Sequence, residues 1–126
     1  MITMVCFTAA GTAYCLPVRA TRSVGTTEGM VELPDPAPEV SGILPGDPSL
    51  TVISPLGATG TRILVLEVGD KTFGLLVDEV TGLQRIDDAD IRPSPRGQDR
   101  SLIAGTLDNA GQLVLVADAT ALAGRL

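Results

Sequence analysis

The chain has 126 residues, a length that predicts one domain. Its 15 acidic and 9 basic residues leave a net charge of −6, which disfavours binding to nucleic acid or to an anionic membrane surface. The sequence has no histidine, so the commonest general base and metal ligand are missing, and we expect neither a metal nor a cofactor.

The first expected element is a β-hairpin at the N-terminus. Apolar side chains recur at every second position on both sides of residues 10–11, which fit a two-residue turn. Counting outward from that turn pairs Phe7 with Tyr14 and Val5 with Leu16. These four side chains should share the inward face of the hairpin.

The same apolar alternation predicts strands along the rest of the chain, at residues 40–44, 50–53, 63–68, 72–77, 80–86, 102–107 and 112–117. Polar segments rich in proline or glycine predict loops at 26–39, 54–61 and 87–101. Asp118 is expected to cap a short helix over 119–126. No apolar run is long enough to span a membrane, and the N-terminus lacks a basic signal-peptide region, so we expect a cytoplasmic protein without membrane insertion.

The chain contains a weak internal repeat. The pattern of residues 7–18 recurs 59 positions later at 66–77, and that of residues 42–53 recurs 63 positions later at 105–116. The predicted fold is therefore mainly β, with two small five-stranded β-barrel lobes packed side by side and a short C-terminal helix. We expect one domain over 1–126, its lobes built from two pseudo-repeats at about 3–54 and 62–118.

Two cysteines are the first candidate for chemistry. The hairpin register places Cys6 opposite Cys15, within reach of a bridge, but cytosolic thiols are normally reduced and no CxxC motif is present. Free, partly buried thiols are the favoured interpretation. A small hydrolase using either cysteine is a rival hypothesis, but the nearest basic residue is Arg19, which cannot accept a proton.

Acidic residues form the other candidates. Asp87, Asp88 and Asp90 lack the glycine-centred loop of a calcium site, so we interpret them as a solvated loop in which Asp90 caps one helical turn. Asp78 and Glu79 are adjacent on a strand and face opposite sides, so they cannot act as an acid–base pair. A groove between two lobes, lined by Val and Leu, is the more promising surface, because such grooves bind apolar helices.

Five segments carry short motifs in a fixed order, at residues 5–18, 33–43, 72–80, 91–95 and 103–118. The most specific is TFGLLVDEV at 72–80. Together they resemble the CheW-like domain, the adaptor fold of bacterial chemotaxis, from Val5 to about Leu122. That fold has two five-stranded barrels around a shared core, in agreement with the repeat.

The resemblance implies a noncatalytic, cytoplasmic adaptor. Such a domain couples the cytoplasmic tip of a methyl-accepting chemoreceptor to the regulatory domain of a CheA-type histidine kinase in signalling arrays, and it also packs against other CheW-like domains. The receptor's helical hairpin is expected in the groove between the lobes. The partner-binding positions implied by resemblance are Val18, Thr21, Ser23, Val24, Leu44, Pro45, Gly46, Gly74, Leu75 and Val77.

The sequence also departs from the family pattern. Pro45 stands where the family usually has an arginine, the hairpin at 44–54 is shorter, Ser54 replaces an aspartate and Ser23 replaces a glutamate. Proline has no side-chain donor and no backbone N–H, so a contact is lost there. The alternative hypothesis is a divergent CheW-like modulator that binds only the receptor or only the kinase and tunes or caps the array.

Overall fold

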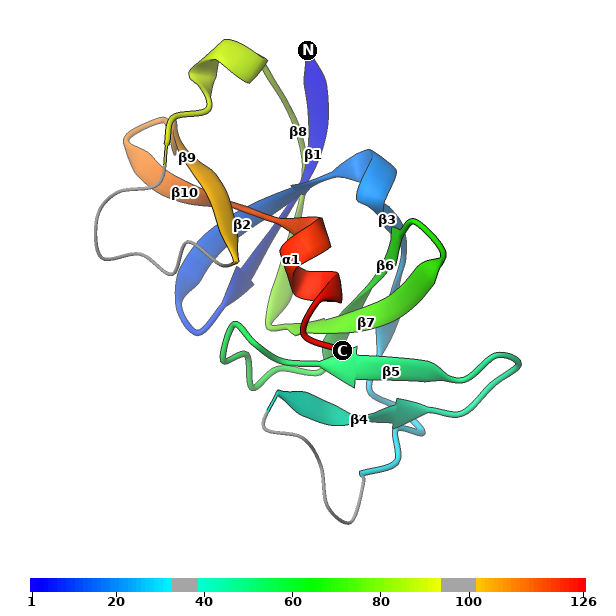
Figure 1. Cartoon of the computed structure of the whole chain (residues 1–126). Helices are drawn as coiled ribbons and strands as arrows, with labels where there is room; N and C mark the ends of the chain where they lie inside the picture. Colours follow the sequence, from blue (N-terminus) through cyan, green and yellow to red (C-terminus); the bar gives the residue numbers. More distant parts are fainter. Residues whose placement is uncertain (33–38, 94–101) are drawn as a thin grey trace.

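The computed structural model describes residues 1–32, 39–93 and 102–126. Two five-stranded sheets account for most of these residues, and each sheet is the framework of one lobe (Figure 1). The strands of lobe A are, in spatial order, β8 (Glu79–Ile86), β1 (Ile2–Ala9), β2 (Thr12–Pro17), β10 (Gln112–Ala117) and β9 (Ile103–Asn109). Those of lobe B are β3 (Thr21–Thr26), β6 (Arg62–Val68), β7 (Lys71–Val77), β5 (Leu50–Ile53) and β4 (Val40–Leu44).

The N-terminal hairpin has the predicted register. Phe7 pairs with Tyr14 and Val5 with Leu16 across β1 and β2. Ala10 and Gly11 both adopt positive φ, 50° and 79°, as a two-residue turn matched to the strand twist requires. The rings of Phe7 and Tyr14 stack with their centroids 5.6 Å apart, which fixes this face of the hairpin toward the core.

The lobes do not coincide with the two sequence repeats. Lobe A combines the first two strands of the chain with the last three, and lobe B takes the five strands between them. Raising or lowering each strand number by five converts one sheet order into the other. The exchange joins β2 to β10 and β5 to β7 as parallel pairs. This equivalence supports our proposal of two pseudo-repeats, each of which contributes strands to both lobes.

Two glycines at matching places support the same duplication. The segment after β3 bridges β4 at Val31–Ile43, and the segment after β8 bridges β9 at Arg92–Thr106. A Cβ atom on Gly42 would lie 2.6 Å from the Val31 carbonyl oxygen, and one on Gly105 would lie 2.6 Å from that of Arg92. Each crossing therefore requires glycine for the close backbone approach.

The prediction of a mainly β chain with two five-stranded lobes and a short C-terminal helix is confirmed, but the barrels are not closed. Each sheet runs from one edge strand to another. In lobe A the edges β8 and β9 are linked by side chains, since Gln84 and Asn109 exchange amide hydrogen bonds of 3.0 and 2.9 Å. The helix α1 (Ala119–Ala123) is shorter than predicted, with Asp118 accepting from the N–H of Ala121 at 3.1 Å.

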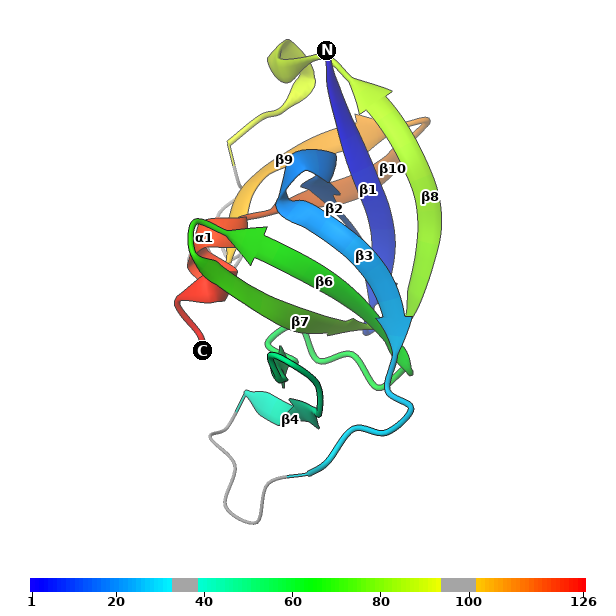
Figure 2. The ribbon, with the colours of Figure 1, turned by 90° about the vertical axis from the view of Figure 1, so that its right-hand side faces the viewer.

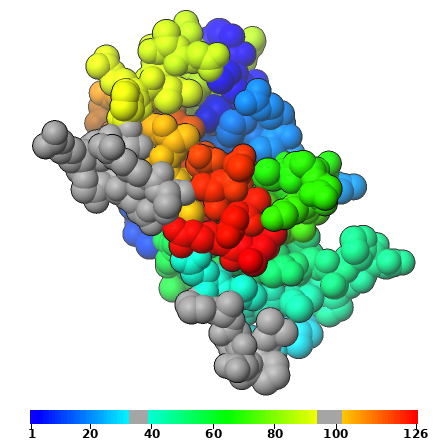
Figure 3. Space-filling model, viewed as in Figure 1, coloured from blue at the N-terminus to red at the C-terminus, as the bar shows by residue number. Residues whose placement is uncertain are grey.

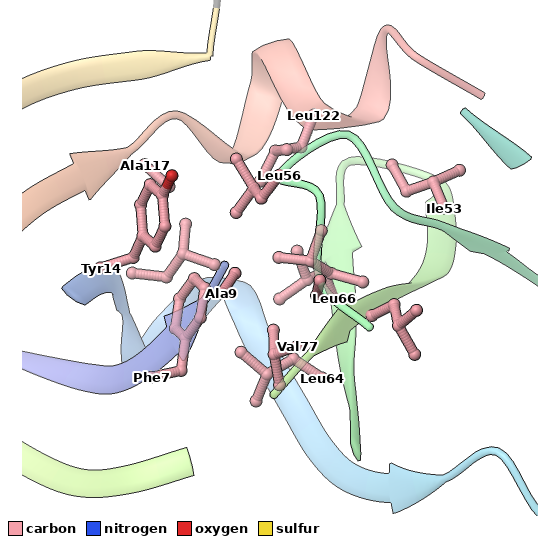
Figure 4. Packing of buried hydrophobic residues seen from close by; sticks show 14 of the residues in the cluster. Phe7, Ala9, Tyr14, Ile53, Leu56, Leu64, Leu66, Val77, Ala117 and Leu122 are labelled. Carbon is pink, nitrogen blue, oxygen red and sulfur yellow. The ribbon is translucent and has the colours of Figure 1, made fainter. Parts of the chain in front are cut away.

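Apolar side chains form two buried clusters. The larger extends through both lobes and includes Phe7, Leu64, Leu66 and Leu122 (Figure 4). The smaller lies on the other face of the lobe A sheet and includes Met4 and Cys15 among other apolar residues. The continuous larger cluster makes the two lobes one packed unit.

The C-terminal segment lies against both lobes. Figure 3 shows it in red at the centre of one face, between segments coloured orange, blue and green. Leu122 of α1 is 0 % exposed, and Arg125 forms an ion pair with Glu39, just before β4. This segment therefore helps to hold the lobes together.

Three details of the sequence interpretation need correction. Strand β3 was missed, because Thr21–Thr26 is exposed or half-buried throughout and has no apolar alternation. The turn η2 (Asp88–Asp90) is capped by Asp87, which accepts from the N–H of Ala89 at 3.1 Å, and not by Asp90. The motif residues 33–38 and 94–95 lie outside the described part of the chain.

Candidate functional site

A surface groove lies between β8, an edge strand of lobe A, and β3, an edge strand of lobe B. Strand β8 forms one wall and β3 the other, and both strands lie beside β1 in Figure 2. Val5 and Leu64 line its base at 5 % and 0 % exposure. The groove encloses about 290 Å³.

The rim of the groove is apolar and open to solvent. Val18, Val24 and Leu83 are 41 %, 53 % and 68 % exposed. Among the described residues, three of the seven exposed large apolar side chains gather at this one groove, and contiguous exposed apolar patches are typical of docking surfaces. Arg22 is the only charged side chain among the described residues that line the groove, and it forms an exposed ion pair with Glu67 at 3.4 Å.

The groove is lined by equivalent residues of the two sequence repeats. Its lining contains pairs of residues separated by 59 positions, the spacing of the hairpin repeat: Val5 with Leu64, Thr21 with Val80, Ser23 with Gly82, and Val24 with Leu83. Equivalent positions of the two repeats therefore face each other across it. The repeat spacing was the signal by which β8 could have been assigned to the site from the sequence.

The structure brings together only part of the predicted site. Four of the expected residues, Val18, Thr21, Ser23 and Val24, line the groove on η1 (Val18–Ala20) and β3. The expected residues of the second hairpin lie elsewhere: Leu44 is half-buried at the end of β4, and Pro45 and Gly46 are exposed in the turn that follows.

The three predicted contact residues on β7 are in the core. Leu75 and Val77 are 0 % exposed, and Gly74 is buried between β5 and β6. In the free chain these residues pack in the core, which accounts for their place in the family motif. Their role as partner-binding residues stays a prediction.

Asp78 connects three segments at the junction of the two lobes. It follows β7 in lobe B and precedes β8 in lobe A. Its carboxylate accepts backbone N–H bonds from Ala10 at 2.8 Å, Thr59 at 3.0 Å and Gly60 at 2.7 Å. These bonds, led by that from Ala10, lower the pKa of Asp78 although desolvation opposes them. One side chain thus ties the β1–β2 turn to the loop before β6.

We expect Asp78→Asn to lower the melting temperature at neutral pH. The amide retains one acceptor oxygen and presents N–H groups where Ala10 donates. Because folding lowers this pKa, the carboxylate stabilises the fold at neutral pH, and the stabilisation is lost as pH falls below about 4. The melting temperatures of the wild type and Asp78→Asn should therefore converge as the pH is lowered from 7 to 3. A difference in melting temperature that stays the same over this range would contradict this role of Asp78.

The cysteines and the acidic residues are the other groups that the sequence offered as candidates for chemistry. Burial raises the pKa of Cys6, and burial together with the neighbouring Cys6 raises that of Cys15 to about 12, so both are protonated thiols at neutral pH. Among the described residues, no three carboxylate or thiol side chains gather as a metal site. Within the same residues, no helix is long and apolar enough to cross a membrane.

The fold is that of a two-lobed β protein with an open groove lined by equivalent residues of its two repeats. The family model of the CheW-like domain matches residues 46–126, more than half of the chain, and the chain therefore belongs to the CheW-like domain family.

Comparison with solved structures gave several matches. One is the scaffolding protein TtCheW from Thermoanaerobacter tengcongensis, with a TM-score of 0.84 and 22 % sequence identity over 93 % of this chain and 84 % of that chain. At this identity the likeness shows the fold. A comparison with curated protein sequences gave no significant match.

Proposed function

We propose that this chain is a noncatalytic, cytoplasmic adaptor that couples the cytoplasmic tip of a methyl-accepting chemoreceptor to the regulatory domain of a CheA-type histidine kinase. Its membership of the CheW-like family and its likeness to a scaffolding protein support this role. The observation that carries the proposal is the open apolar groove rimmed by Val18, Val24 and Leu83.

The groove suits a helical partner. A helix presents apolar residues three and four positions apart, and they can fill an apolar trough while polar residues stay in water. Removing one exposed Leu or Val side chain from water contributes up to about 1.5–3 kcal/mol. The equivalent walls formed by β3 and β8 suit a pair of helices, so the proposed occupant is the helical hairpin of a receptor tip.

The experiment that tests this function is a pair of titrations. One titration uses a purified chemoreceptor hairpin tip and the other a purified kinase regulatory domain, both from the same organism as the chain. The proposal expects calorimetric binding to each. Failure to bind either fragment would contradict an adaptor role.

A second candidate function is a modulator that binds only one of these partners. The turn after β4 favours it, because Pro45 and Gly46 are exposed there and neither side chain can donate a hydrogen bond. An interfacial arginine contributes about 2 kcal/mol or more when it is a central contact, a factor of roughly thirty in affinity. Binding to one fragment alone in the paired titration would favour the modulator.

We expect Pro45→Arg to strengthen association with one partner by roughly tenfold to thirtyfold, because it adds a guanidinium where the family usually has one. The matched control is Ser49→Arg, which adds the same charge at another exposed position of the turn. The two dissociation constants should be compared at two salt concentrations. Equal gains from both variants would indicate a general charge effect and contradict a specific site at Pro45.

A further inference from the structure

Two thiols lie side by side inside lobe A. Cys6 of β1 pairs directly with Cys15 of β2. Both belong to the smaller apolar cluster, Cys15 within it and Cys6 packed against it, so their side chains are on the same face of the sheet. The proximity of Cys6 also contributes to the raised pKa of Cys15.

The pairing type is the one that brings side chains closest. In a hairpin with a two-residue turn, the residues flanking the turn, Ala9 and Thr12, exchange both backbone hydrogen bonds, and the pattern alternates along the strands. Cys6 and Cys15 are three steps from that pair and therefore form a non-hydrogen-bonded pair. Its typical Cα separation of about 4.5 Å lies within the range that disulfides span.

Access to the pair comes through Cys6. Cys15 is 1 % exposed, whereas Cys6 is half-buried and lines a cavity of about 210 Å³. Residues of all five lobe A strands line this cavity, which we call the mouth of lobe A. On the other side of β1, the residue that faces Cys6 is Gly82, which has no side chain to cover the thiol. The Cys6 Sγ donates weakly to Gln84 Oε1 at 4.0 Å.

The fold itself does not need cysteine at these places. The positions 59 residues later are Val65 and Gly74, which pair in the same way across β6 and β7 of lobe B. A lobe of this architecture is therefore built with an apolar pair, and the two thiols are a property of lobe A.

We propose that Cys6 and Cys15 form a cross-strand dithiol that closes to an intramolecular disulfide when a peroxide enters the mouth of lobe A. The Cys6 thiolate attacks one peroxide oxygen, which gives the sulfenic acid at Cys6 and releases water after proton uptake. The Cys15 sulfur then attacks the Cys6 sulfur and displaces its hydroxyl as a second water. Two thiols are thus oxidised by two electrons, and one peroxide is reduced to two waters.

The reaction is slow at neutral pH, and Cys6 reacts with peroxide before Cys15 takes part. Burial raises the pKa of both thiols, that of Cys15 to about 12, and only the thiolate reacts. The rate should rise with pH above 7. The disulfide also constrains the unfolded chain, so the folded-to-unfolded ratio should increase on the order of tenfold or more.

The test is exposure of the purified full chain to hydrogen peroxide at pH 7 and pH 9, followed by intact mass measurement without reductant and thiol counting in denaturant. The expected product is a monomer that has lost two hydrogen atoms and both free thiols, and that dithiothreitol restores. Oxygen addition without hydrogen loss, or a disulfide-linked dimer as the main product, would overturn the proposal.

Single-thiol variants check the order of events. Cys15→Ala removes the second thiol, so peroxide should add oxygen to Cys6. Cys6→Val, which introduces the residue found at the equivalent place in lobe B, should leave Cys15 unmodified for as long as the chain is folded. Equal oxidation of both variants, with melting curves that show them folded, would contradict entry through Cys6. The wild-type mass result remains decisive if a variant does not fold.

Discussion

A Gly74→Arg chain is expected not to fold. Gly74 lies on β7 with β6 and β5 on either side, and a Cβ atom there would come within 2.8 Å of Ile63 Cγ2 and 3.2 Å of Val52 Cγ2. Both neighbours are 0 % exposed and have little room to move. A buried, unpaired guanidinium costs several kcal/mol more. Small domains are stable by about 5–15 kcal/mol, so the steric cost and the cost of the buried charge together are comparable to the free energy of unfolding. Circular dichroism of the purified variant is the measurement.

Alanine at the same position separates crowding from charge. Gly74→Ala should cost about 1–3 kcal/mol of unfolding free energy, the usual range for overpacking. The matched control is Gly25→Ala on β3, where a Cβ atom would meet nothing within 4 Å. Denaturant melts that gave the two alanine variants equal stability, or a Gly74→Arg chain with a native melting curve, would contradict the packing described for β7.

A Leu83→Asp chain is expected to fold, but its affinity for a receptor tip should fall by roughly tenfold to a hundredfold. Leu83 is 68 % exposed on the β8 wall of the groove, so the free protein loses little when it is replaced. In the complex, the variant loses the burial of a leucine, about 1.5–3 kcal/mol, and must desolvate a carboxylate. Titration calorimetry with the receptor hairpin tip measures the change.

Leu113→Asp is the control for this prediction. Leu113 lies on β10, away from the residues that line the groove, and is 55 % exposed. The substitution makes the same change in charge and hydrophobicity. We expect Leu113→Asp to bind the receptor tip like the wild type. Equal weakening by both substitutions would show that the groove is not the binding surface.

Local features of the fold follow from the sequence. The register of the first hairpin could be counted from its turn, because the side chains alternate with period two and residues 10–11 fix the pairing. The Asp118 cap was predictable for a similar reason, since a helix N-terminus needs a nearby acceptor. Both features depend on residues close together in the chain.

The exchange of strands between lobes could not be predicted in this way. It depends on the parallel pairs β2–β10 and β5–β7, in which the partners are far apart in sequence. Alternation shows which face of a strand is buried, but it does not show which strand lies beside it. The internal repeat implies that both halves share one arrangement, but it does not say which strands are neighbours in that arrangement.

The site was predicted in part for related reasons. Strand β3 carries no apolar pattern, and its groove residues were identified through the family resemblance. The opposite wall on β8 was missed, although Val24 and Leu83 are 59 positions apart, the repeat spacing. The burial of the β7 residues was not foreseen, because a sequence motif can reflect packing as well as contact. The Asp78 contacts join three distant segments and could be seen only in the structure.

If this chain links a chemoreceptor to a kinase, it must hold both at once, and a bridging capture measures that property. A chemoreceptor hairpin tip is immobilised, the kinase regulatory domain is supplied in solution, and the chain is added in increasing amounts. We expect kinase retention to rise with added chain and not to rise with the Leu83→Asp variant. Retention that is the same with and without the chain would contradict the adaptor role.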